Sequence, residues 1–386
     1  MKKIFNVLDF GVCGNGIQDE TPFFQKALEV ARWNILQIPD GDYRIVDTLK
    51  LPSDTEIHAS ANARIFHCGS KPKQRGDFMV SNQEVEQGDE NICIKGGIWD
   101  GNFDGINNDK HPDLFCQTAW SGSMFNFQQV RNLHLEDMKL VNSVVFYVRM
   151  GNVDNFHIEN ITFGAKRLSY NQDGLHFGGG CRNGVVRNIR CLDNETNDDL
   201  IALNADDSIV RLENLDLTRD DIENILFENI FADNCYTFTR MLSVNHSIKN
   251  ITFRNIRCGC RAHAINMDGA RYCRTPLFQE EEYPEGCGNI KNIKIEGMYI
   301  YASEENAVQP MIVAETRCKN FRITDFCRDT QKDVPVNPGP TILARNLKNT
   351  SIKITKDGNM EEYRLDQKQD TLEKFGTFEE LVIETQ

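Results

Sequence analysis

Three aspartates in two short segments have the residue type and spacing for acid–base chemistry. Asn171-Gln172-Asp173-Gly174 lies just before an apolar run, and Asn197-Asp198-Asp199 follows about one repeat interval later. If the two segments lie side by side, three carboxylates converge, and repulsion between like charges raises the pKa of at least one. A carboxylic acid that stays protonated near neutral pH can protonate a leaving group, while neighbouring carboxylates activate water. Inverting cleavage of a glycosidic bond requires both functions.

Other interpretations fit the same residues. Aspartate and asparagine are common turn residues that hydrogen-bond to their own backbone, and clustered carboxylates can hold a calcium ion. A polysaccharide lyase or related transferase would use the cluster with calcium and a basic residue that abstracts a proton. A non-catalytic carbohydrate-binding solenoid would bind glycan without turnover.

A repeated phrase predicts how the two acidic segments are brought together. An asparagine followed by alternating apolar residues recurs, for example as VRNLHLEDMKL from Val130, IENILFENIFA from Ile222 and IKNITFRNIRC from Ile248. The asparagines stand at positions 132, 155, 183, 224, 250, 292, 320 and 349, at intervals of 23 to 42 residues. Repeats of this length are typical of solenoids, and alternation within each copy indicates strands rather than helices.

We therefore predict an all-β fold, a single-stranded parallel β-helix whose inward side chains stack from rung to rung. Asparagine at a fixed place fits a turn, because it tolerates left-handed backbone, and stacked asparagines can form a ladder. Segments one rung apart are neighbours, which brings Asp173 close to Asp198 and Asp199.

The chain is predicted to form one domain over residues 1–386. Thr21 as cap and Pro22 as first residue predict a helix, and an N-terminal capping helix would protect the open end of the coil. The apolar stripe of this helix is Phe24, Ala27, Leu28 and Ala31. We assign residues 1–60 to the cap region, 61–345 to the central coils and 346–386 to a C-terminal coil and tail.

Composition excludes several functional classes. Apolar residues make up 40 % of the chain, and no apolar run is long enough to span a membrane. The net charge of −14 argues against nucleic acid and anionic membranes as partners. The first residues lack the apolar stretch of a secretory signal, and the thirteen cysteines include no CxxC pair, so we expect reduced thiols and a cytoplasmic protein. The oligomeric state is left open.

The chain resembles the pectin-lyase-like β-helices, and within them glycoside hydrolase family 28, the polygalacturonases and their relatives. The opening FNVLDFGVCGNGIQDETPFFQKAL resembles the N-terminal entry of that superfamily. NQDGLHF and NDDLIALN resemble the Asn-Thr-Asp-Gly and Gly-Asp-Asp segments of the family. The resemblance covers about residues 4–330 and implies a right-handed coil, hydrolysis of an oligosaccharide or polysaccharide, and no metal or organic cofactor.

The resemblance also implies roles for individual residues. Asp198 matches the general acid of the family, and Asp173 and Asp199 match the pair that activates water. Asn171 matches the asparagine beside the first aspartate.

Two further family motifs are missing. The Gly-His-Gly segment corresponds to Tyr236–Arg240, and the Arg-Ile-Lys that grips a substrate carboxylate corresponds to Ala264–Asp268, without either basic residue. An ordinary polygalacturonase is therefore not expected. Nearby arginines could bind a carboxylate or sulfate instead, or could only cover apolar neighbours at the surface. The predicted substrate-binding residues are Asn171, His176, Arg240, Arg261, His263 and Arg271.

Overall fold

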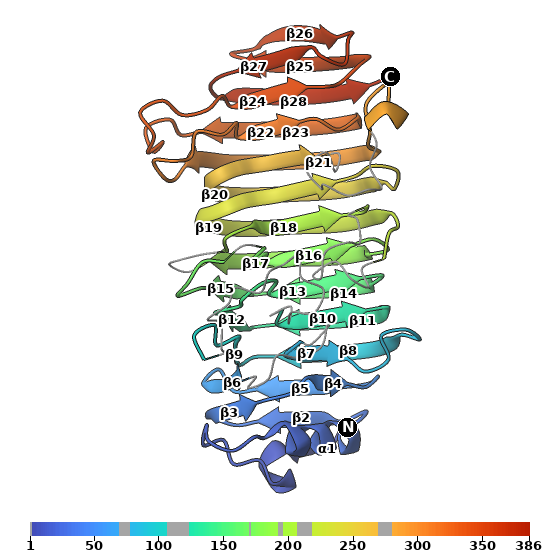
Figure 1. Ribbon diagram of the computed structural model, residues 1–386, viewed down its shortest axis with the longest axis vertical. Coiled ribbons are helices and arrows are strands. Elements are labelled where there is room, and N and C mark those ends of the chain that lie inside the picture. Colours follow the sequence, from blue (N-terminus) through green and yellow to red (C-terminus); the bar gives the residue numbers. More distant parts are fainter. Residues whose placement is uncertain are drawn as a thin grey trace.

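The computed structural model describes residues 2–68, 78–105, 123–169, 171–191, 196–206, 218–268 and 280–386. These residues form a right-handed, single-stranded parallel β-helix, which confirms the predicted fold class. Figure 1 shows the strands stacked along one long axis, from the N-terminal end in blue to the C-terminal end in red.

One row of strands carries the asparagine repeat. Neighbouring strands of this row pair in parallel, and in one such pair His134 is aligned with His157. This first row consists of β2 (Ile35–Ile38), β5 (Glu56–Ala59), β8 (Asp89–Lys95), β11 (Val130–Glu136), β14 (Asp154–Glu159), β17 (Arg182–Cys191), β19 (Ile222–Leu242), β20 (Ile248–Asp268), β21 (Ile290–Ala302) and β23 (Cys318–Arg328). Strand β1 (Ile4–Asn6) pairs with β2.

Two further rows complete the coil. The second row begins with β3 (Gly41–Ile45), β6 (Ala63–His67), β9 (Ile98–Asp100), β12 (Lys139–Val141) and β15 (Thr162–Gly164). The third row contains β4 (Leu49–Leu51), β7 (Val80–Asn82), β10 (Phe125–Gln128), β13 (Val148–Gly151), β16 (Leu175–Gly178), β18 (Asp199–Asn204), β22 (Ile312–Ala314) and β24 (Ile342–Arg345). Strands β19 and β20 are long enough to bend from the first row into the third, where Asp199 is aligned with Thr237.

Stacked apolar side chains fill the coil with a continuous core. Phe227 and Phe253 are aligned on neighbouring rungs and stack with ring centroids 4.7 Å apart. Phe177 of the third row contacts Phe156 and Phe227 of the first row across the interior, with centroids 5.5 Å apart in each pair. Because each rung buries its apolar side chains against the next, every added rung contributes hydrophobic stabilisation.

The repeated asparagines form a ladder along the first row. Asn250 has left-handed backbone with φ of 56°, and the other seven asparagines of the repeat also have positive φ. Asn250 Nδ2 donates to Asn224 Oδ1, and Asn292 Nδ2 donates to Asn250 Oδ1, each at 3.0 Å. A second ladder runs through Asn160, Asn188, Asn229 and Asn255. The amides of Asn224, Asn250 and Asn292 each both donate and accept, so these side chains hold the rungs in register.

Helix α1 (Thr21–Val30) covers the N-terminal end of the coil, after the 3-10 helix η1 (Val7–Phe10) (Figure 1). Its predicted apolar stripe is buried. The prediction that Thr21 caps the helix is wrong, because Glu20 precedes the first helical residue, which is Thr21 itself. A capping oxygen must come from the residue before the helix. The Thr21 hydroxyl instead accepts the backbone N–H of Val46 at 2.9 Å and ties the helix to the coil.

The C-terminal end differs from a parallel coil. The short 3-10 helix η3 (Glu280–Glu282) precedes β21. After the last parallel strand, the chain forms β25 (Thr350–Lys356), β26 (Asn359–Leu365), β27 (Thr371–Lys374) and β28 (Phe378–Thr385). These strands pair antiparallel with one another or with β23 and β24. Antiparallel pairing covers the last parallel edge, which would otherwise be open to another chain. In the described part of the chain, no helix has the length and apolar character needed to cross a bilayer.

Candidate active site

Asp173, Asp198 and Asp199 meet on adjacent rungs of the third row. Asp173 lies just before β16, and Asp199 opens β18, which pairs in parallel with β16. The Gly174 amide donates to the Asp199 carbonyl at 3.0 Å and links the two segments. One carboxylate oxygen from each aspartate lies within 4.8 Å of the others. The structure therefore brings the three predicted carboxylates into one cluster.

The three aspartates differ in accessibility. Asp173 and Asp199 are each 3 % exposed, whereas Asp198 is half-buried. A separation of at most 4.8 Å lets one water molecule bond to two carboxylates at ordinary distances of about 2.7–2.8 Å each. The same oxygens are also suitable ligands for a divalent cation.

Close packing against the next rung explains why the residue after Asp173 is a glycine, Gly174. A Cβ built at this position would lie 2.6 Å from the Leu200 carbonyl oxygen on the next rung. Any larger residue would have to push the rungs apart. Glycine thus permits the close approach of backbone that sets the spacing between Asp173 and Asp199.

His176 contacts Asp173 on the outer face of the third row, because its neighbours Leu175 and Phe177 point into the core. Its Nδ1 lies 2.6 Å from Asp173 Oδ2, and both side chains are 5 % exposed. The ring packs on Phe146 with centroids 4.6 Å apart, and its Nε2 lies 3.4 Å from Asn204 Nδ2. His176 is thus buried against Asp173 and Phe146 and is not among the residues that line the pocket described below, so its contact with substrate stays a prediction.

A pocket of about 520 Å³ opens beside the aspartates. It lies over the third row, between β18 and β24. Its lining residues are Asp198, Asp199, Tyr236, Thr237, Arg240, Ala262, His263, Asn266, Gln309, Pro310, Val313, Leu343 and Arg345. Two of the three candidate catalytic carboxylates thus border a space that could hold a sugar residue.

Arg240 and His263, two of the predicted substrate-binding residues, line this pocket. Arg240 is aligned with Ala202 of β18, one rung away. His263 is aligned with Thr237, and its Nδ1 donates to the Pro310 carbonyl at 2.6 Å, which fixes the ring at the pocket wall.

Tyr236 and Arg345 also line the pocket, and the sequence does not predict either residue there. Tyr236 is 42 % exposed and offers an aromatic face. Arg345 ends β24, and its guanidinium pairs with the buried carboxylate of Glu315. Arg345 lies several rungs beyond the aspartates, and only the alignment of β22 with β24 could have revealed its place.

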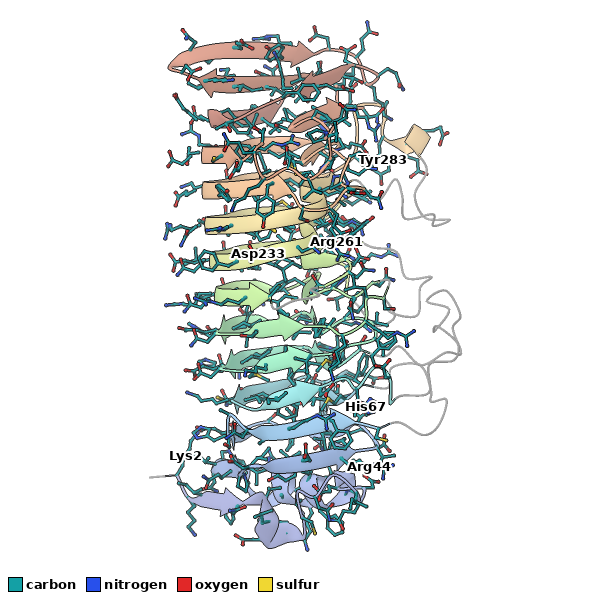
Figure 2. All side chains as sticks on the ribbon, turned by 90° about the vertical axis from the view of Figure 1, so that its left-hand side faces the viewer. Lys2, Arg44, His67, Asp233, Arg261 and Tyr283 are labelled. Carbon is teal, nitrogen blue, oxygen red and sulfur yellow. The ribbon has the colours of Figure 1, made fainter. Side chains whose placement is uncertain are left out.

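Arg261 is not among the residues that line the pocket, and its role in substrate binding stays a prediction. Its side chain is 8 % exposed and lies on the central rungs (Figure 2). Nη1 donates to Asn197 Oδ1 at 2.9 Å and Nη2 donates to the Thr196 carbonyl at 2.7 Å. Asn197 Nδ2 in turn donates to the Ser169 carbonyl at 3.0 Å. Arg261 therefore clamps the segment that carries Asp198.

An irregularity in strand pairing explains the position of the Arg261 side chain. The pairing of β19 with β20 shifts between Cys235 and Thr237, whose partners are Cys260 and His263. Arg261 falls at this bulge. A bulge redirects side chains, so counting along the repeat does not give the direction of Arg261.

Two of the predicted substrate-binding residues remain. Asn171 has left-handed backbone with φ of 54° and is half-buried, but it is not among the residues that line the pocket. Arg271 lies outside the described residues.

A family model and a curated relative match parts of this sequence. The model of a family described as rhamnogalacturonase A/epimerase, pectate lyase-like, matches residues 4–270. The pre-neck appendage protein of Bacillus phage B103 is 26 % identical over 144 residues, which is 36 % of this chain and 16 % of that protein. The chain thus spans less than a fifth of the length of this curated relative.

Two solved structures share the fold. PfbA, a surface adhesin of Streptococcus pneumoniae, has a TM-score of 0.57 at 14 % identity, covering 89 % of this chain and 83 % of that chain. A family 28 exopolygalacturonase of Yersinia enterocolitica has a TM-score of 0.52 at 14 % identity, covering 86 % and 76 %. At such low identity both comparisons establish the β-helix fold alone.

Proposed function

We propose that this chain, which belongs to the rhamnogalacturonase A/epimerase, pectate lyase-like family, is a glycoside hydrolase that acts on an oligosaccharide or polysaccharide. The observation that carries the proposal is the cluster of Asp173, Asp198 and Asp199 at the edge of a pocket of about 520 Å³. Three carboxylates beside a space of this size can supply both an acid and a base to one glycosidic bond.

Asp198 is the proposed general acid. It is the most accessible of the three aspartates and borders the pocket, so it can reach the glycosidic oxygen. Its proton passes to this oxygen as the bond to the anomeric carbon breaks. The leaving sugar departs with a new hydroxyl group.

Asp173 and Asp199 are the proposed base pair that binds and deprotonates water. A carboxylate only accepts hydrogen bonds, so His176 Nδ1 carries the proton in its bond to an ionised Asp173. The water oxygen attacks the anomeric carbon, and one of its protons passes to the aspartate pair. His176 acts as a positioning residue, because its bond to Oδ2 fixes the Asp173 carboxylate.

Inversion at the anomeric carbon is part of the proposal and needs its own test. Carboxylates in two-carboxylate inverting sites are about 6.5–9.5 Å apart, and those in retaining sites about 5–5.5 Å. The carboxylate oxygens here lie within 4.8 Å of one another, but the cluster has three members. A water molecule can therefore lie between Asp173 and Asp199 while Asp198 protonates the glycosidic oxygen. Proton NMR of the first product formed distinguishes inversion from retention.

An acidic sugar is the proposed substrate class. Arg240 and Arg345 line the same pocket as Asp198 and Asp199, within a chain of net charge −14. Guanidinium groups at the pocket favour a carboxylate or sulfate on the bound sugar, although Arg345 also pairs with Glu315. Oligosaccharides with and without such groups, compared for release of reducing ends, test this choice directly.

A non-catalytic glycan-binding protein is the second candidate function. The similarity to a phage appendage protein and the fold shared with an adhesin favour it. This candidate predicts binding of oligosaccharide without any new reducing ends. A lyase on the same scaffold would instead yield an unsaturated product that absorbs in the near ultraviolet, and chelation of calcium would abolish its formation.

A further inference from the structure

Trp33 occupies the first position of the asparagine ladder. The pairing of the first row continues the ladder from Asn132 to Asn91 and Asp54. The next position toward the N-terminus is Trp33, because Ile35 is aligned with Glu56. The Trp33 amide also donates to the Asp54 carbonyl at 2.9 Å. A tryptophan thus stands where the following rungs have asparagine or aspartate.

The backbone of Trp33 is strained. Its φ is 62°, close to the values of 63° at Asp54 and 58° at Asn91. Asparagine and aspartate tolerate this left-handed region, whereas a bulky residue there is a rare and strained outlier. The fold would therefore accept asparagine at position 33 more easily than tryptophan. Such an outlier points to a use for the side chain.

The Trp33 ring is exposed but held in place. It is 62 % exposed, the Arg32 guanidinium lies 4.6 Å from the ring centroid, and Arg32 Nε donates to the Ser53 carbonyl at 3.1 Å. An aromatic ring fixed in this way loses little conformational entropy when a ligand stacks on it. In contrast, Trp99 is buried in the core.

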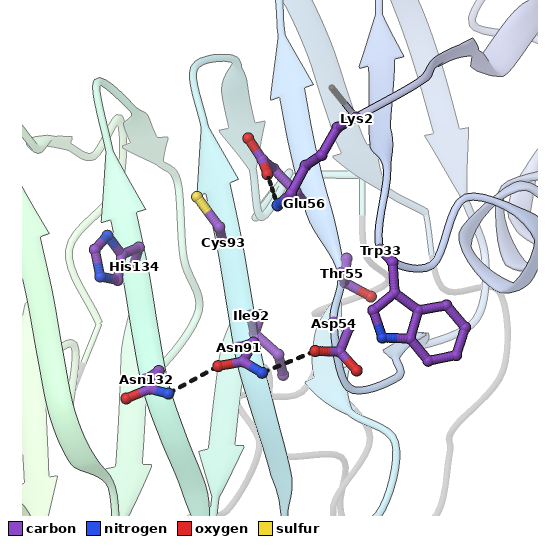
Figure 3. A pocket seen from close by; sticks show the side chains of 10 residues that line it. All are labelled: Lys2, Trp33, Asp54, Thr55, Glu56, Asn91, Ile92, Cys93, Asn132 and His134. Atoms are coloured by element: carbon purple, nitrogen blue, oxygen red, sulfur yellow. Dashed lines mark hydrogen bonds and ion pairs between the residues drawn. The ribbon is translucent and has the colours of Figure 1, made fainter.

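A pocket of about 430 Å³ lies beside the ring (Figure 3). Figure 3 shows the Asp54 carboxylate next to Trp33 and bonded to the Asn91 amide, with Asn132 one rung further along. Asp54 Oδ1 accepts from Asn91 at 2.8 Å, while Asp54 Oδ2 has no hydrogen-bond partner within the described ranges. The pocket thus combines an aromatic face with an acceptor for a hydroxyl group.

The charges around this pocket balance. Lys2 pairs with Glu56 at 2.5 Å, the Arg32 guanidinium stacks on the Trp33 ring, and Asp54 lines the pocket beside that ring. An anionic sugar that stacks on Trp33 would therefore meet the Asp54 carboxylate, which repels it.

We propose that Trp33 and Asp54 form a second carbohydrate-binding site, on the first row of strands, that takes a neutral sugar residue. The apolar face of the sugar stacks on the indole ring, and a sugar hydroxyl donates to Asp54 Oδ2. Figure 2 places Lys2 at the N-terminal end and Arg261 on the central rungs, so the two sites lie far apart along the coil. The site requires a glycan ligand but no turnover.

The test compares Trp33→Asn with wild-type protein in binding and in stability. Binding of neutral hexasaccharides (of glucose, xylose and galactose) and of a galacturonate hexasaccharide is measured by calorimetry and tryptophan fluorescence. We expect a neutral hexasaccharide to bind wild type and to lose about tenfold or more in affinity with Trp33→Asn, as for removal of an aromatic anchor. Phe375→Ala, which removes another exposed ring (67 % exposed), should bind as wild type.

Stability separates a binding role from a structural one. Trp33→Asn should unfold at the same or a higher temperature than wild type, since asparagine suits the left-handed backbone and extends the ladder. The proposal is overturned if no neutral hexasaccharide binds wild type, if Trp33→Asn binds unchanged, or if it loses stability along with binding. Binding through Trp33 without any hydrolysis would leave this site standing and remove only the hydrolase proposal.

Discussion

Arg261 Nη1 donates to Asn197 Oδ1 at 2.9 Å, and Asn197 directly precedes Asp198, the proposed general acid. The second guanidinium nitrogen donates to the Thr196 carbonyl at 2.7 Å. Two bonds from one planar group fix both the position and the direction of this segment. The placement of the acid therefore depends on a buried residue that does not line the pocket.

Replacing Arg261 with lysine should lower kcat about tenfold or more and change KM little. Lysine keeps the charge but cannot hold two acceptors in one plane, and small displacements of a catalytic group are costly. Steady-state kinetics and a thermal melt of the same preparation check this result. Arg254→Lys on the same strand is the matched control, since Arg254 is exposed and pairs with Glu228 and Glu296. Equal kcat in the two variants would contradict the positioning role.

Replacing Gly174 with alanine should destabilise the fold by about 1–3 kcal/mol, as expected for overpacking. The added Cβ would lie 2.6 Å from the Leu200 carbonyl oxygen, so β16 and β18 must separate. Turnover should fall as well, because the same rungs set the distance between Asp173 and Asp199. Denaturant unfolding gives the free energy. Wild-type stability in this variant would show that the rungs separate without strain.

Replacing Asn250 with alanine should destabilise the coil by about 1–2 kcal/mol, whereas glycine should cost less. Alanine loses both ladder bonds and must adopt a φ of 56°, while glycine loses only the bonds. The difference between the two variants measures the cost of the left-handed backbone alone. Equal unfolding free energies for the two would contradict this separation.

The pH dependence of stability should include a small contribution from His134. Burial, and then the neighbouring His157, lower the pKa of His134 below its usual value of 6.5. The unfolded chain therefore binds this proton more readily than the folded chain does. The contribution of neutral His134 to the free energy of unfolding is complete above about pH 6.5, and it is lost as the pH falls through the pKa of the folded state. Urea unfolding at pH 8 and pH 5 should show a smaller pH dependence for His134→Gln. An unchanged dependence would assign the effect to other groups.

The sequence predicts the coil well because its signal is repeated. The asparagines mark turns with left-handed backbone in rung after rung, and the apolar residues between them alternate as strands require. The same regularity places Asp173 one rung from Asp199. It also places Arg240 at the pocket, since no bulge intervenes in the pairing of β18 with β19.

The parts that the sequence does not predict depend on local irregularity or on distant rungs. Arg261 lies at a bulge, so its side chain takes a direction that the repeat does not encode. Arg345 reaches the pocket from β24, far along the chain from the aspartates. The antiparallel C-terminal strands have alternation like that of parallel strands, and alternation alone does not give direction.

The most direct test of the account is hydrolysis by wild type, Asp198→Asn and Asp325→Asn, measured as reducing ends released from an active oligosaccharide. Asparagine cannot donate the acidic proton, so Asp198→Asn should lose turnover by about 10²–10⁴-fold and keep wild-type unfolding behaviour. Asp325 is exposed with φ of 54°, where asparagine is well tolerated, so Asp325→Asn should match wild type. Undiminished release of reducing ends by folded Asp198→Asn would contradict the proposed mechanism.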